Sequence, residues 1–301
     1  MSWTLDHVPD QSGRIAIVTG ANSGLGLETA RALAGKGMTV VMACRNAEKA
    51  EAARTAIQLQ YPKTTLPIQL LDLSRLASVR AFARGFAEKY ARLDLLINNA
   101  GIMMPPYALS DDCFESQLAA NYLGHFALTG LLLPLLLKTE GSRVVSLSSL
   151  AHKWGAIQFD DLQFERGYNR RLAYSQSKLA CLMFAYELQR RLTLAGSQTL
   201  SVAAHPGISA TNLFQHLPGV LKPFFPLMNL ALQPARDGAL PTLYAALGEH
   251  IKGGDYCGPK SLGEMRGPPV KVGSNRASRD VAAAARLWTL SEKLTGVSFA
   301  F

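Results

Sequence analysis

Cysteine is scarce in this 301-residue sequence, and the four cysteines lie far apart. Cys44, Cys113, Cys181 and Cys257 form no C-x-x-C pair and have no spacing typical of metal ligands. Small secreted domains that depend on disulfides carry denser and more regular cysteine patterns. We therefore expect four free thiols, no metal centre and a cytoplasmic location, where thiols stay reduced.

Long hydrophobic runs are missing as well. The longest, "FALTGLLLPLLL" at residues 126–137, falls short of the ~20 residues that span a bilayer, and it contains Pro134. The first residues, "MSWTLDHVPDQSG", carry acids where a signal peptide would carry bases. We therefore expect no signal peptide and no transmembrane segment, and we interpret residues 126–137 as a buried helix.

Dense basic clusters are also absent, although the formal net charge is +9. The densest is the short "RGYNRR" at residues 166–171, and no nucleic-acid-binding motif accompanies it. We therefore expect no nucleic-acid partner. The positive charge instead favours small anionic ligands or an acidic membrane surface.

Six short apolar runs alternate with amphipathic stretches along the chain. They are "RIAIVTG" (14–20), "MTVVMAC" (38–44), "LPIQLLDL" (66–73), "LDLLINNAG" (93–101), "RVVSLSS" (143–149) and "TLSVAAHPG" (199–207). Continuous apolar runs are typical of strands buried on both faces. The alternation predicts a Rossmann-type α/β fold, which is a doubly wound parallel sheet flanked by helices on both faces. Since no linker interrupts it, we expect a single domain over residues 1–301, closed by a helix near 277–295.

A glycine-rich turn, "TGANSGLG" (19–26), follows the first run. Gly20 would allow a tight exit from the strand, Gly24 would let the backbone approach a pyrophosphate, and Gly26 would let helix and sheet pack closely. The N-terminus of the following helix would add unpaired N–H groups for the phosphates. The turn therefore predicts a dinucleotide site, with a purely structural turn as the alternative.

The end of the second run bears on the choice of cofactor. An acidic residue there would bind the ribose 2′-hydroxyl of NAD, but this chain has the neutral Cys44 followed by Arg45. A guanidinium favours a 2′-phosphate, and hence NADP(H) over NAD(H), unless Arg45 is an ordinary solvated arginine. In "LLDLS", Asp72 would either meet the adenine or cap the helix that begins near Ser74.

The stretch "AYSQSKLA" (173–180) sets Tyr174 and Lys178 four residues apart, so a helix would project both side chains from one face. Such a pair is often no more than part of a helix surface. An ammonium beside a phenol would, however, favour the phenolate form. This pair becomes informative only together with the other motifs.

With "NNAG" (98–101), "AANYLGHF" (119–126) and "SLSS" (146–149), these motifs resemble the short-chain dehydrogenase/reductase family over nearly the whole chain. "NNAGIMM", "NYLGHFALT", "SSLAHKWG" and "AAHPG" are similar to its retinol dehydrogenase-like branch and the bacterial relatives of that branch. The resemblance implies an enzyme that interconverts carbonyl and alcohol groups with a nicotinamide cofactor. The N-terminal hydrophobic anchor of the membrane-bound members is not seen in this sequence.

The resemblance also implies a catalytic tetrad of Asn121, Ser149, Tyr174 and Lys178, with Ser148 as the alternative serine. Tyr174 would act as general acid and base, and Lys178 would stabilise its phenolate and hold the nicotinamide ribose. Ser149 would bind the substrate oxygen, and Asn121 would hold a water. The cofactor would contact Gly20, Ser23, Gly24, Leu25, Gly26, Arg45, Asp72, Leu73, Asn99, Ala100, Gly101, Tyr174, Lys178, His205, Pro206, Gly207 and Thr211.

The substrate side of the expected site is apolar. A proline-containing apolar segment at about 208–236, which includes Phe214, falls where the family covers its substrate pocket. Met103 and Met104 would add adaptable apolar surface beside Ser149. We expect a small lipophilic aldehyde, ketone or alcohol as substrate; for the apolar segment itself, an oligomer contact or plain core is the alternative. Family members are commonly homodimers or homotetramers, so we also expect self-association.

Two other functions fit the same fold. An epimerase-type member would share the Tyr–Lys pair, but such enzymes usually carry a T-G-x-x-G-x-x-G turn rather than the G-x-x-x-G-x-G spacing present here. A non-catalytic nucleotide-binding or interaction protein could also keep the fold. The complete tetrad argues against that alternative.

Overall fold

In the computed structural model, which describes residues 3–208 and 233–301, eight strands form one sheet in the order β3-β2-β1-β4-β5-β6-β7-β8. The strands are β1 (Ile15–Thr19), β2 (Thr39–Cys44), β3 (Ile68–Leu70), β4 (Leu95–Asn98), β5 (Arg143–Leu147), β6 (Leu200–Ala204), β7 (Tyr256–Ser261) and β8 (Arg266–Lys271). All neighbours pair in parallel except β7 and β8, which are antiparallel. β1 pairs with both β2 and β4, so the strand order reverses beside β1. Ligands of such sheets bind at this reversal, beyond the carboxyl ends of the strands.

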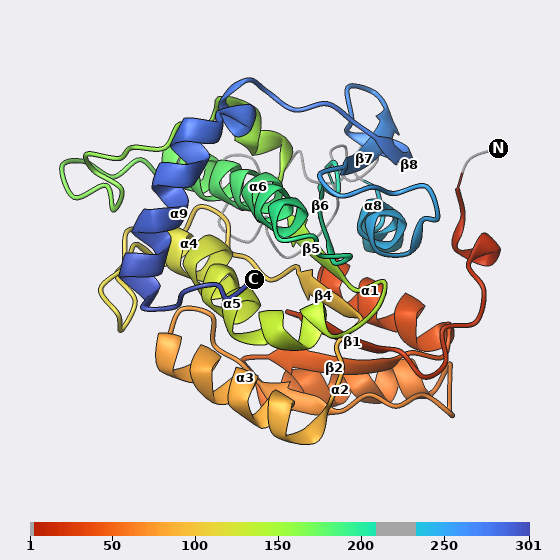
Figure 1. The fold of residues 1–301 in the computed structure, drawn as a ribbon. Coiled ribbons are helices and arrows are strands. Elements are labelled where there is room, and N and C mark those ends of the chain that lie inside the picture. The colour runs from red at the N-terminus through yellow and green to blue at the C-terminus, as the bar shows by residue number, and fades with distance from the viewer. Residues whose placement is uncertain (1–2, 209–232) are drawn as a thin grey trace, which may run out of the picture.

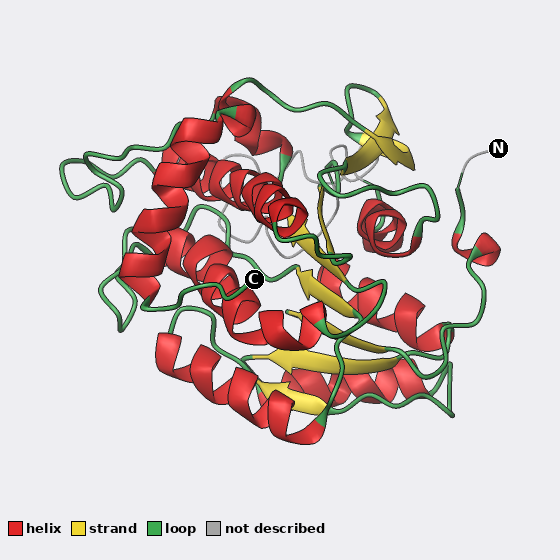
Figure 2. Cartoon of the chain, viewed as in Figure 1, coloured by secondary structure: helices red, strands yellow, loops and turns green. Residues whose placement is uncertain are grey.

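Helices cover both faces of the sheet (Figure 1, Figure 2), and the predicted single-domain α/β fold is confirmed. One core contains buried residues of α1 (Gly24–Gly35), α2 (Ala47–Gln58) and α8 (Ala235–Leu247). The other contains buried residues of α3 (Leu76–Lys89), α5 (Gly124–Leu137), α6 (Arg170–Leu194) and α9 (Val281–Thr295). Shorter helical pieces are η1 (Leu5–His7), α4 (Ser116–Leu118), the π-helix η2 (Ala119–Leu123), η3 (Leu150–Trp154) and η6 (Ala277–Arg279).

Two parts of the sheet differ from the sequence-based expectation. The run at 66–73 forms only the three-residue β3, and Leu70 is 55% exposed, because this strand lies at the sheet edge and is not buried on both faces. The sequence analysis also missed the hairpin of β7 and β8. Gly258, Pro259 and Pro269 interrupt the strand pattern there. Proline is tolerated at both positions, because Pro269 lies on the edge strand β8 and Pro259 lies next to a register shift.

The apolar run at 126–137 is confirmed as a buried helix. It forms most of α5, which carries apolar residues on all sides. The helix packs against α9 and against the aromatic side chains of Trp288 and Phe299. In the part of the chain that the structure describes, the helical stretch Ser116–Leu137 is the one apolar and long enough to cross a membrane. Its most apolar part is 72% buried inside the fold, as in the core helix of a globular domain.

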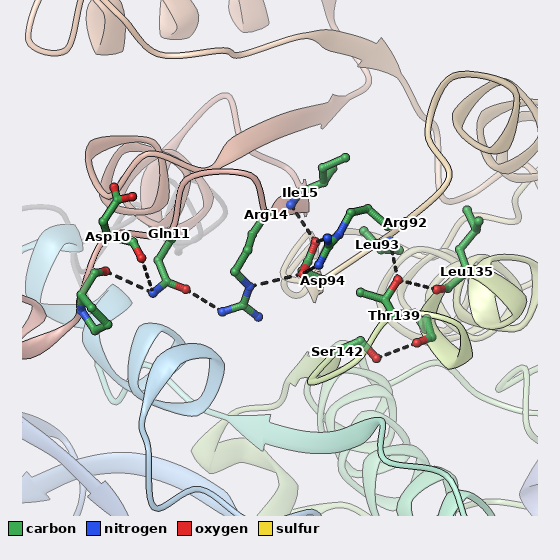
Figure 3. A network of polar contacts seen from close by, with 12 residues as sticks. Asp10, Gln11, Arg14, Ile15, Arg92, Leu93, Asp94, Leu135, Thr139 and Ser142 are labelled. Carbon is green, nitrogen blue, oxygen red and sulfur yellow. Dashed lines mark hydrogen bonds and ion pairs between the residues drawn. The ribbon is translucent and has the colours of Figure 1, made fainter.

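A buried carboxylate ties together the amino ends of the central strands (Figure 3). Asp94, which precedes β4 and is 1% exposed, accepts hydrogen bonds from the backbone N–H of Ile15 at 2.9 Å and from Nη2 of Arg92 at 2.7 Å. Nε of Arg14 lies 3.3 Å from the same carboxylate. The backbone carbonyl of Asp94 accepts from N–H of Arg143 at 2.8 Å. One residue therefore aligns β1, β4 and β5.

We expect Asp94→Ala to lower the free energy of unfolding by about 2 to 3 kcal/mol, because the Ile15 N–H, the half-buried Arg14 and the exposed Arg92 lose their acceptor. Asp94→Asn, which retains an acceptor, should lose less. Chemical denaturation measures both variants, with the exposed Asp160→Ala as control. An Asp94→Ala variant as stable as the control would contradict this role.

Candidate active site

A cleft of about 370 Å³ opens beyond the carboxyl ends of β1, β2 and β4. Its lining includes many residues that the sequence analysis assigned to the cofactor or substrate: Gly20, Ser23, Gly24, Leu25, Gly26, Arg45, Asp72, Leu73, Asn99, Ala100, Gly101 and Met103. The sequence analysis missed Asn22, Ala43, Leu71, Ile102 and Ala120, which also line it. Each lies within or next to a motif or apolar run that had been recognised, so its position in the chain was the available signal.

The glycine turn has a conformation that other residues adopt only at a cost. Gly20 and Gly24 have φ values of +68° and +54°, in the left-handed region. A Cβ on Gly26 would overlap the Gly20 carbonyl and lie 2.5 Å from the side-chain amide nitrogen of Asn99. α1 begins at Gly24 without a side-chain cap from Ser23, so its first N–H groups are available to an anion.

Among the described residues, one cation and one carboxylate line the cleft near the ends of β2 and β3. Arg45 is exposed at the end of β2, next to Cys44, whose thiol pKa is raised to about 11 by burial. Asp72 Oδ1 accepts hydrogen bonds from the backbone N–H and hydroxyl of Ser74, at 3.0 and 2.6 Å. The N–H of Leu76, the first residue of α3, instead donates to Asp112 at 2.7 Å. Asp72 therefore holds the turn before α3, whereas Asp112 accepts the first N–H of the helix itself; contact of Asp72 with the adenine stays a prediction.

Three residues of the predicted tetrad lie together. Tyr174 and Lys178 project from α6, each 6% exposed, and Lys178 Nζ lies 6.0 Å from the centroid of the Tyr174 ring. Lys178 Nζ also donates to the carbonyl of Leu147 at 3.1 Å. Asn121 Nδ2 donates to Ser177 Oγ at 2.9 Å. A Cβ on Gly101 would lie 3.1 Å from Asn121 Oδ1 and 3.4 Å from Lys178 Nζ, so the cleft lining extends to this group.

The two candidate serines differ in what their hydroxyls do. Ser148 is buried, and its hydroxyl donates to the carbonyl of Lys178 at 2.8 Å. Ser149 is only half-buried and caps η3, where its Oγ accepts from the N–H of Ala151 at 3.2 Å. Among the described residues no acceptor takes the hydroxyl hydrogen of Ser149, so it can be donated to a substrate oxygen. This difference favours Ser149, but the catalytic role stays a prediction.

Other predicted residues are only partly accounted for. His205, Pro206 and Gly207 follow β6, and the described stretch ends one residue later at 208. Met104 has its N–H bonded to Gln117 Oε1 at 2.9 Å. Thr211, Phe214 and most of the apolar segment at 208–236 lie outside the described residues.

The sequence analysis missed His125, which connects two parts of the site. The hydroxyl of Thr19 lies 2.9 Å from His125 Nε2 and accepts the N–H groups of Asn99 and Ala100, both at 2.9 Å. Nδ1 of the same imidazole lies 3.0 Å from the carbonyl of Asn121. Nδ1 must donate to that carbonyl, so Nε2 accepts the Thr19 hydroxyl hydrogen. A histidine four residues after Asn121 was visible in "NYLGHF", but its partners are not evident from sequence.

Burial lowers the pKa of His125 to about 4 and keeps the imidazole neutral, as its two hydrogen bonds require. As pH falls, the unfolded chain binds this proton near pH 6.5, before the folded protein does. The stability that neutral His125 contributes is thus complete above about pH 6.5 and is lost as pH falls towards 4.

Between pH 7 and pH 5, we expect the free energy of unfolding of the wild type to fall by about 2 kcal/mol more than that of His125→Gln. Denaturation at both pH values measures it, and equal losses would contradict the assignment.

Comparison with known proteins gives a consistent picture. A family model for short chain dehydrogenases matches residues 14–219. Human retinol dehydrogenase 12 is 40% identical over 285 residues, which cover 95% of this chain and 87% of that protein. Human retinol dehydrogenase 13 is 40% identical over 292 residues, which cover 95% and 85%.

Solved structures share the fold. The crystal structure of an uncharacterized protein from Mycobacterium paratuberculosis has a TM-score of 0.84 at 45% identity, and the match covers 100% of both chains. The Pseudomonas aeruginosa RhlG/NADP active-site complex has a TM-score of 0.64 at 24% identity, with 82% of this chain and 94% of that chain covered. At that identity the likeness concerns the fold alone.

Proposed function

Since the chain belongs to the short chain dehydrogenase family and is an NAD(P)-dependent oxidoreductase, we propose that it interconverts a lipophilic aldehyde or ketone and the corresponding alcohol with NADP(H). One observation carries the proposal: Tyr174, Lys178 and Asn121 converge beside Gly101, which lines the same cleft as the glycine turn. This arrangement combines a proton donor with a site for a dinucleotide.

The residues of the cleft fit such a cofactor. The open N-terminus of α1 and the glycines before it suit a pyrophosphate, which needs close backbone approach and N–H donors. Arg45, flanked by the uncharged Cys44 and Asn46, suits a 2′-phosphate. An acidic side chain would stand there in a site built for NAD. These features support NADP(H) over NAD(H).

When bound, the cofactor would supply or accept the hydride. Tyr174 would donate the proton to the carbonyl oxygen during reduction and accept it during oxidation. The ammonium of Lys178, buried on the same helix face, would stabilise the phenolate that forms. The hydroxyl of Ser149 would donate to the substrate oxygen as negative charge develops on it.

The expectation of a lipophilic substrate has two supports. Met103 lines the cleft with flexible apolar surface, next to Ile102. The similar human proteins are named retinol dehydrogenases, and retinol is a lipophilic alcohol. We therefore propose a retinoid-like, steroid-like, aromatic or medium-chain carbonyl, or its alcohol.

We expect Tyr174→Phe to lower kcat by about 10²- to 10⁴-fold and to leave NADPH binding nearly unchanged, because only the proton-donating hydroxyl is removed. NADPH consumption with a panel of lipophilic aldehydes and ketones measures turnover, and fluorescence titration measures binding. The matched control is Tyr186→Phe, about three turns along the same helix, whose hydroxyl bonds to Ser274. Full activity of Tyr174→Phe would exclude the assigned mechanism.

We expect Arg45→Ala to weaken NADPH binding about ten- to a hundredfold and NADH binding far less, because the lost guanidinium contacts only a 2′-phosphate. Titration with each cofactor measures the ratio. Arg54→Ala, which removes a cation paired with Glu51 on α2, serves as control. Equal weakening of both cofactors would show that Arg45 does not distinguish them.

A further inference from the structure

The hairpin between β7 and β8 has an unfavourable backbone at its tip. Leu262, Gly263 and Glu264 follow one another with φ values of +51°, +65° and +67°. Two of these residues are not glycine, and successive left-handed residues with side chains are rare because the Cβ crowds the backbone. Such conformations persist where the surrounding contacts hold them, and they gather at functional sites. At this tip, Glu264 contacts the segments that follow β6 and β5.

Glu264 contacts the segment that follows β6. Its Oε2 lies 3.1 Å from Nε2 of His205, which is fully buried. The N–H of Gly207 donates to His205 Nδ1 at 3.2 Å, so Nδ1 is the acceptor nitrogen and Nε2 carries the hydrogen. Burial lowers the pKa of His205 and so favours this neutral form. His205 therefore donates to Glu264 and accepts from Gly207.

The hairpin backbone holds the same segment. The N–H of Ile208 donates to the carbonyl of Met265 at 2.9 Å. Gly207 has a φ of +67°, and a Cβ there would overlap the Met265 carbonyl. On β7, a Cβ on Gly258 would overlap Nε2 of His205, so glycine makes room for the imidazole. Residues 205–208 are thus fitted against the hairpin by both side-chain and backbone contacts.

The other carboxylate oxygen of Glu264 contacts the segment that follows β5. Oε1 lies 3.2 Å from Nζ of Lys153, in the short helix η3. The residue that caps this helix is Ser149, and Nδ1 of His152 lies 2.7 Å from the Ser149 carbonyl. One carboxylate therefore bridges the segment of the proposed catalytic serine and the segment expected at the nicotinamide.

We propose that Glu264 is a positioning residue that holds residues 205–208 and the Ser149 segment in register for the nicotinamide half of the cofactor. This inference rests on the proposed function. Glu264 is absent from the lining of the cleft at Gly20, Arg45 and Asp72, where the adenosine half would bind. Replacement of Glu264 should therefore weaken binding of the nicotinamide half of the cofactor and leave binding of the adenosine half unchanged.

The test measures the binding of NADPH and of 2′,5′-ADP, which lacks the nicotinamide half, to wild type and Glu264→Ala. We expect Glu264→Ala to weaken NADPH binding roughly tenfold and to lower kcat, because a charge-assisted contact to each of the two segments is lost. Binding of 2′,5′-ADP should not change. A merely structural role would weaken both ligands, and unchanged NADPH binding would overturn the proposal.

Glu264→Gln tests the same idea if the alanine variant folds poorly. It retains an oxygen that can accept from His205 but loses the charge that faces Lys153, so we expect about a threefold loss for NADPH alone. Glu140→Ala, at an exposed position three residues after α5, is the matched control and should leave the binding of both ligands unaffected. Wild type that binds neither NADPH nor NADH would overturn the proposed function and this role together. Normal wild-type binding with no NADPH-specific loss in either variant would overturn only the role of Glu264.

Discussion

The rest of the site depends on the hydrogen bonds of the Thr19 hydroxyl. It stands at the end of β1, accepts the N–H groups of Asn99 and Ala100 beyond β4, and donates to the buried imidazole of His125. Because β1 and β4 are neighbours at the reversal of strand order, their ends separate into different connections. The Thr19 contacts hold these ends at a defined spacing. The glycine turn, the "NNAG" turn and the π-helix that carries Asn121 are thereby placed relative to one another.

Several buried polar groups near the site have hydrogen-bond partners that suit a single protonation state. Lys178 Nζ donates to the Leu147 carbonyl, and Ser148 donates to the Lys178 carbonyl. His125 and His205 are both fully or almost fully buried, and burial lowers the pKa of each. With those imidazoles neutral, the ammonium of Lys178 is the cation that the described part of the chain places beside Tyr174. Hydrogen bonds of this kind offset the cost of burying polar groups.

Sequence reasoning succeeded where a pattern reports a local physical requirement. Continuous apolar runs located the strands β1 to β6 apart from their ends, and the positive φ of Gly20 agrees with the tight exit from the strand that was predicted there. It failed where a partner distant in the chain decides the outcome. Asp112 rather than Asp72 caps α3, and the glycines and prolines of β7 and β8 hid a hairpin. The assigned roles of Tyr174, Ser149 and Arg45 remain predictions.

The sequence by itself determined the fold class, the glycine turn after β1 and the i, i+4 spacing of Tyr174 and Lys178, because each depends on neighbours within a few positions; the full tetrad came from the family resemblance and stays a prediction. Hydrophobic periodicity, glycine at strained turns and the i, i+4 spacing of a helix are all of this kind. Only the tertiary structure decided which serine keeps a hydroxyl hydrogen available, which tautomer His125 adopts, and that Glu264 reaches both His205 and Lys153. Those outcomes depend on hydrogen-bond geometry between residues up to 111 positions apart, which no local pattern encodes.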